Sequence, residues 1–419
     1  MSHPSPAPSW ASELTLAPAG ERRLALPALP LAAVCVYVLG LASPLAVDVP
    51  LAVLALLALA AVVRSRPSLR PGDAALERAL VVFLVVTAVS AAGALDPARS
   101  LRLLAVFLPG ILLYVLIARW VAVRDLGALV ATLALAALAL AATVLWASWL
   151  EGLRDPTAIV RALGISTLVV PNDVALLAVI APLSLALLLR SGTRPVRALL
   201  ALSLAATAAA LVVLQSRSAL AAMAAALIAV VVLLRARRTL AGLGALALAA
   251  VALDGARGFP LAAKLGRLAD TRPALWLTGL AMWADAPVLG HGPRSFGPLY
   301  AAYRDELALA AWLPVDERLV PWAHSLYVEA LAEQGLLGFL ALVAVLGCAL
   351  RAAWCRYRAT EGESRALAAG TLVGLATFVV LGAIELTLLR QWVVVVACVL
   401  LALAGKGPPP HTVIRKEAP

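Results

Sequence analysis

The stretch LGALVATLALAALALAATVLWASW, residues 126–149, decides the fold because it contains no charged side chain. An α-helix rises 1.5 Å per residue, so about 20 apolar residues cross the roughly 30 Å hydrocarbon core of a bilayer. Similar runs recur from Leu24 to Leu403, and 63% of the 419 residues are hydrophobic while 14% are charged. A water-soluble domain with this composition would aggregate. We therefore predict that the bilayer is the solvent of this chain.

The length of these runs favours helices, which satisfy their backbone hydrogen bonds within one segment, over the strands of a barrel. We predict an all-α fold, a polytopic transmembrane helical bundle of about 12 spans. The predicted spans are 24–43, 45–63, 76–94, 101–118, 126–149, 172–189, 198–214, 218–234, 239–254, 323–350, 366–384 and 391–404.

The distribution of arginine gives the predicted topology. Cytoplasmic loops of membrane proteins carry an excess of Lys and Arg, and with the N-terminus inside, four basic clusters fall on the cytoplasmic side. Residues 1–23 and 405–419 are then cytoplasmic tails, residues 24–404 form the membrane domain, and residues 255–322 form one large periplasmic loop with short helices. The four clusters are Arg64/Arg66/Arg70, Arg190/Arg194/Arg197, Arg235/Arg237/Arg238 and Arg351/Arg356/Arg358.

Several function classes are disfavoured by the same pattern. The net charge of +11 is explained by the topology, so we expect no nucleic acid partner. The predicted cytoplasmic loops are too short for a nucleotide-binding domain, and no Walker-type glycine loop is present. We expect no metal site, because His291 and His324, the only predicted external histidines, have no cluster of cysteines or carboxylates at ligand spacing.

Two arginines at predicted periplasmic helix ends are candidates for binding an anion. Arg217 lies in Gln-Ser-Arg-Ser, residues 215–218, where one span ends and the next begins, and Arg272 starts a predicted external helix, Pro273–Asp285. A helix N-terminus favours negative charge, and a guanidinium group binds phosphate oxygens in pairs. The alternative for each is an arginine that reaches the membrane interface without a ligand.

His324 begins the predicted span 323–350 and is the candidate general base. A neutral imidazole at the membrane boundary can take a proton from an attacking sugar hydroxyl, and the alternative is a structural histidine. Tyr327 lies on its helical face, whereas Glu329 does not. We expect Asn172 to cap a helix. We expect Glu385 and Arg390, which flank the last external turn, to pair with each other or with lipid headgroups.

The predicted external helix carries Trp276, Leu280 and Trp283 at spacings of four and three residues, on one face. Tryptophan is amphipathic and concentrates at membrane interfaces. We therefore interpret Pro273–Asp285 as an interfacial helix that its tryptophans anchor.

Three stretches of the sequence together resemble the O-antigen ligase and O-antigen polymerase family of bacterial membrane glycosyltransferases. They are Gln-Ser-Arg-Ser-Ala at 215–219, Arg-Pro-Ala-Leu-Trp at 272–276 followed by Ala-Pro-Val-Leu-Gly-His-Gly-Pro at 286–293 with Phe296, and His-Ser-Leu-Tyr-Val-Glu-Ala-Leu-Ala-Glu-Gln-Gly-Leu-Leu-Gly at 324–338. The sequence departs from the family pattern in having Ser325 where Asn is usual, and in having His291-Gly292-Pro293-Arg294 in a stretch that is usually richer in glycine.

The resemblance implies a multi-pass enzyme of the bacterial inner membrane with its active site facing the periplasm. It implies a glycan donor linked to undecaprenyl pyrophosphate, an acceptor that is lipid A-core or another glycan, and no metal, nucleotide or other cofactor. By the same resemblance Arg217 and Arg272 hold the pyrophosphate, and His324 acts as general base or orients the acceptor. We count Arg294, Tyr327, Ser216 and Asn172 as supporting residues.

Our first hypothesis is an O-antigen ligase of lipopolysaccharide biosynthesis, which transfers the glycan with inversion to lipid A-core. The runner-up is a polymerase that joins lipid-linked repeat units, and a protein-glycosylating enzyme is a third variant. The alternative of another class is a polysaccharide or lipid transporter. A transporter is expected to place charged or helix-breaking residues at mid-membrane depth, where this sequence has mainly Ala, Leu and Val.

Overall fold

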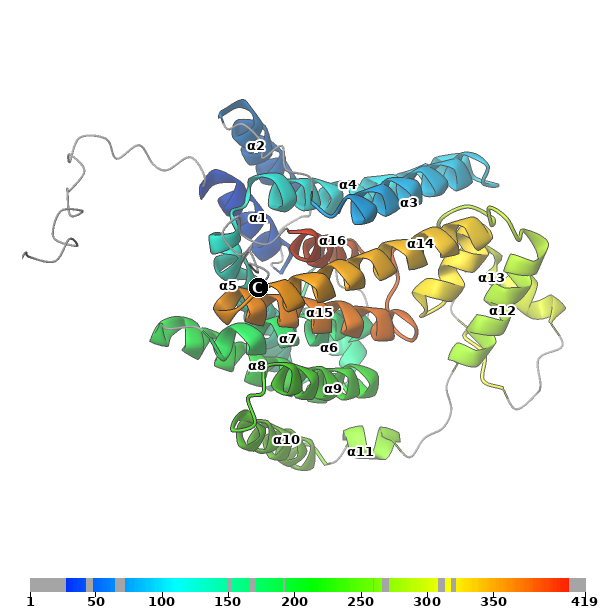
Figure 1. The fold of residues 1–419 in the computed structure, drawn as a ribbon. Helices are drawn as coiled ribbons and strands as arrows, with labels where there is room; N and C mark the ends of the chain where they lie inside the picture. Colours follow the sequence, from blue (N-terminus) through cyan, green and yellow to red (C-terminus); the bar gives the residue numbers. More distant parts are fainter. Residues whose placement is uncertain are drawn as a thin grey trace, which may run out of the picture.

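The computed structural model describes residues 28–42, 48–64, 72–149, 152–165, 171–190, 193–258, 260–265, 271–307, 313–317 and 322–406. All secondary structure in these ranges is helical (Figure 1). The predicted tails lie outside them except for Gly405 and Lys406.

The α-helices are α1 (Ala28–Leu41), α2 (Asp48–Arg64), α3 (Ala74–Ala92), α4 (Pro97–Trp120), α5 (Leu126–Trp149), α6 (Pro156–Ala162), α7 (Leu177–Leu188), α8 (Arg194–Val213), α9 (Arg217–Leu233), α10 (Thr239–Ala256), α11 (Pro260–Leu265), α12 (Arg272–Asp285), α13 (Phe296–Glu306), α14 (Leu326–Ala359), α15 (Gly362–Gly382) and α16 (Gln391–Gly405). The 3-10 helices are η2 (Val123–Asp125) and η3 (Pro171–Leu176).

The helical class predicted from the sequence is confirmed. Eight helical segments in the described ranges are long and apolar enough to cross a membrane, and they include α3, α4, α5, α8, α10, α14 and α15. Four further apolar helices, α1, α2, α9 and α16, match predicted spans but their apolar parts are shorter, between 10 and 17 residues. The count of about 12 spans therefore stays a prediction.

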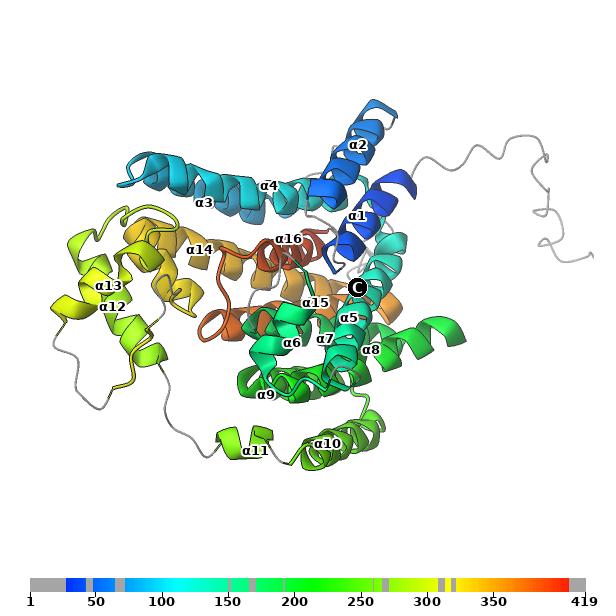
Figure 2. The ribbon, with the colours of Figure 1, turned by 180° about the vertical axis from the view of Figure 1, so that it is seen from behind.

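The bundle has a buried centre and an exposed edge. Helices α7, α15 and α16 lie inside, where α7 packs on α15 and α16 packs on α4. The main neighbours of helix α10 are α8, α9 and α11. It lies with α11 along one edge of the bundle in both views (Figure 1 and Figure 2). Apolar side chains such as Leu248, which is 73% exposed, face outward from α10. Such a surface fits lipid contact.

Helices α12 and α13 gather at one end of the bundle, on the right of Figure 1, which we call the loop end. They pack on the first turns of α14 through a small apolar cluster. Gly279 allows this approach, because a Cβ atom there would lie 2.4 Å from Val328 Cγ1. The cluster contains Leu275, Met282, Phe296, Tyr300, Ala323 and Ala332. The predicted helix Pro273–Asp285 is confirmed as α12.

Helix α14 is broken at Gly335, where φ is 64° and ψ is −165°. The segment between α12 and α13 supplies the hydrogen bonds that the break removes. Leu336 N donates to Pro287 O at 2.8 Å, and Gly292 N donates to Glu333 O at 2.8 Å. Only glycine readily adopts this backbone conformation. The first part of α14, residues 326–334, is thus a separate rod tied to the 286–296 segment.

We expect Gly335→Ala to destabilise the protein by about 3 kcal/mol, because the backbone conformation excludes a side chain and a Cβ atom would lie 2.3 Å from Val288 C. Thermal unfolding of the detergent-solubilised protein should show a lower midpoint. Gly347→Ala is the matched control, because it lies in the same helix and a Cβ atom there meets nothing within 4 Å. Equal midpoints for the two variants would contradict the assignment.

Candidate active site

The Gln-Ser-Arg-Ser stretch forms the turn between α8 and α9 at the loop end. Gln215 has a φ of 53°, and Arg217 is the first residue of α9. The half-buried Arg217 therefore lies beside the free amide groups of a helix N-terminus, which adds to the positive potential of its guanidinium group. Ser216, the residue before the helix, is buried.

Glu385 joins this turn to α12. Its Oε1 accepts a hydrogen bond from Arg272 Nη2 at 2.7 Å and another from Ser218 Oγ. The carboxylate is buried, and its Oε2 has no hydrogen-bond partner among the described residues. The expectation that Glu385 pairs with Arg390 is wrong, because the chain after α15 turns Glu385 toward α9 and α12 instead. Glu385 thus brings the segments of Arg217 and Arg272 together.

Arg390 belongs to the surroundings of His324. Its Nε lies 3.2 Å from Asp173 Oδ1 in an ion pair, and its guanidinium carbon lies 4.8 Å from the ring centroid of Trp322. The Trp322 ring is in turn 4.8 Å from the His324 ring. Stacking on an aromatic face attracts the guanidinium group and leaves its N–H groups available for hydrogen bonds. Sequence analysis singled out neither Asp173 nor Trp322.

His324 precedes α14 in an unusual backbone conformation. Its φ is 52°, its side chain is buried, and its Nδ1 lies 3.2 Å from Asn172 Nδ2. The next residue, Ser325, caps α14 by accepting from Val328 N. Positive φ in a residue other than glycine costs about 1 kcal/mol or more and gathers at functional sites. Of the four such residues in the described ranges, three are Gln215, Arg294 and His324, which lie in or beside the three stretches.

The orientation of the Asn172 amide determines which nitrogen of the neutral His324 imidazole carries the proton. With the amide nitrogen donating to Nδ1, a neutral ring carries its proton on Nε2 and acts as a donor. With the amide turned over, Oδ1 accepts from Nδ1–H and Nε2 becomes the basic nitrogen. Asn172 is therefore the residue that selects between a base and a hydrogen-bond donor.

Helix α12 connects the arginines to the histidine. Trp276, one turn after Arg272, donates from Nε1 to Ala323 O at 3.1 Å, next to His324. The sequence interpretation of Trp276 as an interfacial anchor missed this contact. A series of hydrogen bonds therefore runs from Ser218 through Glu385 to Arg272, and α12 continues it to Trp276 and the His324 segment.

Two predicted supporting residues lie away from this series. Tyr327 donates its hydroxyl to Val379 O at 2.9 Å, which fixes α14 on α15. Arg294 lines a different pocket, together with Asp96 and two arginines at the beginning of α4.

His291, the second histidine of the predicted loop, is engaged elsewhere. Its Nε2 lies 2.9 Å from Met282 O and 3.3 Å from the Tyr303 hydroxyl. Burial and a hydrogen bond to Asp285 raise the pKa of Tyr303 to about 12. These contacts fit a structural role in packing α12 on α13.

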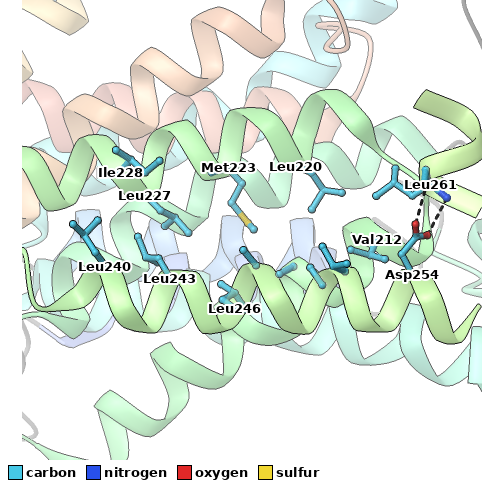
Figure 3. A pocket seen from close by; sticks show the side chains of 17 residues that line it. Val212, Leu220, Met223, Leu227, Ile228, Leu240, Leu243, Leu246, Asp254 and Leu261 are labelled. Carbon is cyan, nitrogen blue, oxygen red and sulfur yellow. Dashed lines mark hydrogen bonds between the residues drawn. The ribbon is translucent and has the colours of Figure 1, made fainter. Parts of the chain in front are cut away.

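An apolar groove of about 640 Å³ lies between α8, α9 and α10. Figure 3 shows it running between α9 and α10, from Asp254 and Leu261 at one end to Ile228 and Leu240 at the other. Leu220, three residues after Arg217, lies toward the first end. Its one charged lining residue, Asp254, accepts from Leu261 N at 2.9 Å and from Ala262 N at 3.1 Å and so begins α11. Because its other lining residues are apolar, the groove is suited to an alkyl or isoprenoid chain.

Residues 201–343 match the family model described as O-antigen ligase. The match runs from α8 into α14 and includes Arg217, Arg272 and His324. It confirms the resemblance stated from the sequence. No curated protein matches the chain. With the candidate membrane spans, the match fits a multi-pass membrane protein of the O-antigen ligase and polymerase type.

Proposed function

We propose that this protein, whose residues 201–343 match the family model described as O-antigen ligase, transfers a glycan from undecaprenyl pyrophosphate to a hydroxyl of lipid A-core, with inversion at the transferred sugar. The observation that carries the proposal is the series of contacts from Ser218 through Glu385 and Arg272 to the His324 segment, because it joins all three family-like stretches at one end of the bundle. As the resemblance implies, the reaction uses neither a metal ion nor a nucleotide.

Arg217 and Arg272 stabilise the leaving diphosphate in this proposal. The diphosphate carries about two negative charges beside low-dielectric lipid, where fixed cations are most effective. Arg272 holds Glu385 at 2.7 Å, and the bidentate fork of its guanidinium group suits a second anionic partner. Glu385 keeps Arg272 in place, and Arg272 stabilises the negative charge that develops on the diphosphate as it leaves.

His324 receives the acceptor hydroxyl. The oxygen of that hydroxyl bonds to the anomeric carbon on the face opposite to the diphosphate, while the bond from carbon to the diphosphate oxygen breaks. In the base role the hydroxyl proton moves to His324 Nε2, which requires Asn172 Oδ1 to accept from Nδ1–H. In the orienting role Nε2–H donates to the acceptor, and the hydroxyl proton passes to an oxygen of the departing diphosphate.

We place the isoprenoid tail of the donor in the groove between α8, α9 and α10, whose lining begins one turn from Arg217. We expect Ala247→Trp, which fills the groove, to raise the KM for a long-chain donor about tenfold and to change the KM for a short-chain donor little. Leu248→Trp is the control, because Leu248 is the next residue of α10 and faces outward from the groove. Equal effects of the two variants would contradict this placement.

We further propose that the loop end faces the periplasm of a bacterial inner membrane, with residues 255–322 as the periplasmic loop, 24–404 as the transferase domain, and the tails 1–23 and 405–419 in the cytoplasm. A pocket lined by Arg190, Arg235 and Arg365 at helix ends away from α12 and α13 supports this orientation.

Gene deletion followed by gel analysis of lipopolysaccharide tests the proposal. A ligase predicts loss of all attached O-antigen while long lipid-linked polymer accumulates. A single attached repeat unit would instead identify the protein as a polymerase, which is also compatible with the family match. Unchanged lipopolysaccharide, with no glycan transfer by the reconstituted protein, would contradict both and favour a transporter.

A further inference from the structure

A second pocket at the loop end is lined by arginines that the proposed transfer chemistry does not use. It has a volume of about 330 Å³ and lies between the 286–296 segment and the beginning of α4. Three of its four lining residues are cationic, and one is acidic. The lining residues are Asp96, Arg99, Arg102 and Arg294.

The three guanidinium groups of this pocket outnumber the carboxylates beside them, which are Asp96 in the lining and the buried Glu333 behind Arg294. The side chains of Arg99, Arg102 and Arg294 form no ion pair with a carboxylate in the described ranges. Asp96 uses Oδ1 to accept from Arg99 N at 3.0 Å, which caps α4. Three guanidinium groups around one cavity repel each other, so the arrangement favours an anion with more than one negative charge.

The framework of the pocket is fixed by buried contacts. Glu333 accepts from Arg294 N at 2.8 Å and from Phe296 N at 3.0 Å, and Ser100 donates to Pro293 O at 2.8 Å. Arg294 is held at a φ of 67°. These bonds set the Arg294 segment against the first turn of α4, so the three guanidinium groups are brought together by the fold.

The pocket stands in a defined relation to the candidate active site. His324 lies two residues before the rod of residues 326–334, and Glu333, which holds the Arg294 segment, lies near the end of the rod. The seven helical steps from Leu326 to Glu333 rise about 10 Å, and the non-helical residues His324 and Ser325 add to this distance. A glycolipid that spans this distance, about two to three sugar rings, reaches both places at once.

We propose that the pocket of Arg99, Arg102 and Arg294 binds a phosphate group on the acceptor glycolipid and so determines which acceptor hydroxyl reaches His324. The inference rests on the proposed function, since it assigns this second site to the acceptor. A phosphate monoester matches the site because it carries up to two negative charges and three oxygens for bidentate arginine contacts.

Binding of lipid A-core to the purified full-length protein in nanodiscs tests the proposal, with and without prior phosphatase treatment of the lipid. Arg99→Gln combined with Arg102→Gln should weaken binding of the phosphorylated lipid at least tenfold and leave binding of the dephosphorylated lipid unchanged. Arg161→Gln is the matched control, because Arg161 is exposed near the end of α6 and lines neither site. Unfolding midpoints verify that the variants are folded.

Two outcomes would overturn the proposal. One is equal binding of phosphorylated and dephosphorylated acceptor by the unaltered protein. The other is displacement of the acceptor by phosphatidylglycerol at an equal mole fraction, which would make the pocket a site for lipid headgroups. Because binding is measured without donor, phosphate-selective binding without any glycan transfer would refute the proposed function and leave the anion site standing.

Discussion

Replacing His324 with alanine is expected to lower the turnover of glycan transfer by a factor of about 100 to 10,000, the range that general acid–base catalysis contributes. Transfer is measured in vesicles that contain a lipid-linked glycan donor and lipid A-core. Donor affinity should change little, because the arginines are assigned to the diphosphate. His291→Ala is the control, since His291 contacts Met282 O and Tyr303. Near-normal transfer by His324→Ala would exclude both roles of the imidazole.

Asn172→Asp separates the two roles of His324. A carboxylate at this position accepts from Nδ1–H and leaves Nε2 as the basic nitrogen. If His324 is the base, the variant keeps or increases its rate, whereas Asn172→Ala loses the fixed orientation and slows. At a pH at which the imidazole is neutral, Asn172→Asp removes the proton from Nε2, so the rate falls if His324 only donates a hydrogen bond from that nitrogen. The sign of the change decides between the two.

Arg272→Ala is expected to lower kcat/KM by at least 100-fold, because the developing charge on the diphosphate loses a fixed cation. It also leaves the buried Glu385 without its arginine, which costs about 3 kcal/mol of stability. Arg272→Lys should restore stability in part but not transfer, since an ammonium group lacks the bidentate fork. Enzyme kinetics and thermal unfolding measure the two effects separately.

A double variant separates catalysis from stability at this position. Arg272→Ala with Glu385→Gln has no unpaired carboxylate, so its unfolding midpoint should recover while transfer stays low. Recovery of transfer by the double variant would show that Arg272 serves only to neutralise Glu385.

The sequence was sufficient for features that depend on local pattern. The predicted span 126–149 coincides with α5, and the predicted external helix coincides with α12 to within one residue, because apolar length and an N-terminal proline are local signals. The family-like stretches gave Arg217, Arg272 and His324, and the structure connects their segments. Their catalytic roles stay predictions.

The sequence was insufficient where partners are far apart along the chain. Arg272 and Glu385 are separated by 113 positions, and Asn172 and His324 by 152. Charge spacing favoured Glu385 with Arg390, the nearest cation, but the turn after α15 separates them. The break at Gly335 was also missed, because hydropathy is continuous across the predicted span 323–350 and contains no information on a backbone dihedral angle.

The interruption of α14 has a consequence for substrate length. Because hydrogen bonds at Ser325 and Glu333 tie the rod of residues 326–334 at both ends, the fold sets the spacing between His324 and the proposed acceptor pocket. With its phosphate in the arginine pocket, a shortened acceptor would place its hydroxyl short of the His324 imidazole, and an extended one would place it past the imidazole. Truncated core oligosaccharides should therefore fail abruptly at one length instead of declining gradually with each sugar removed.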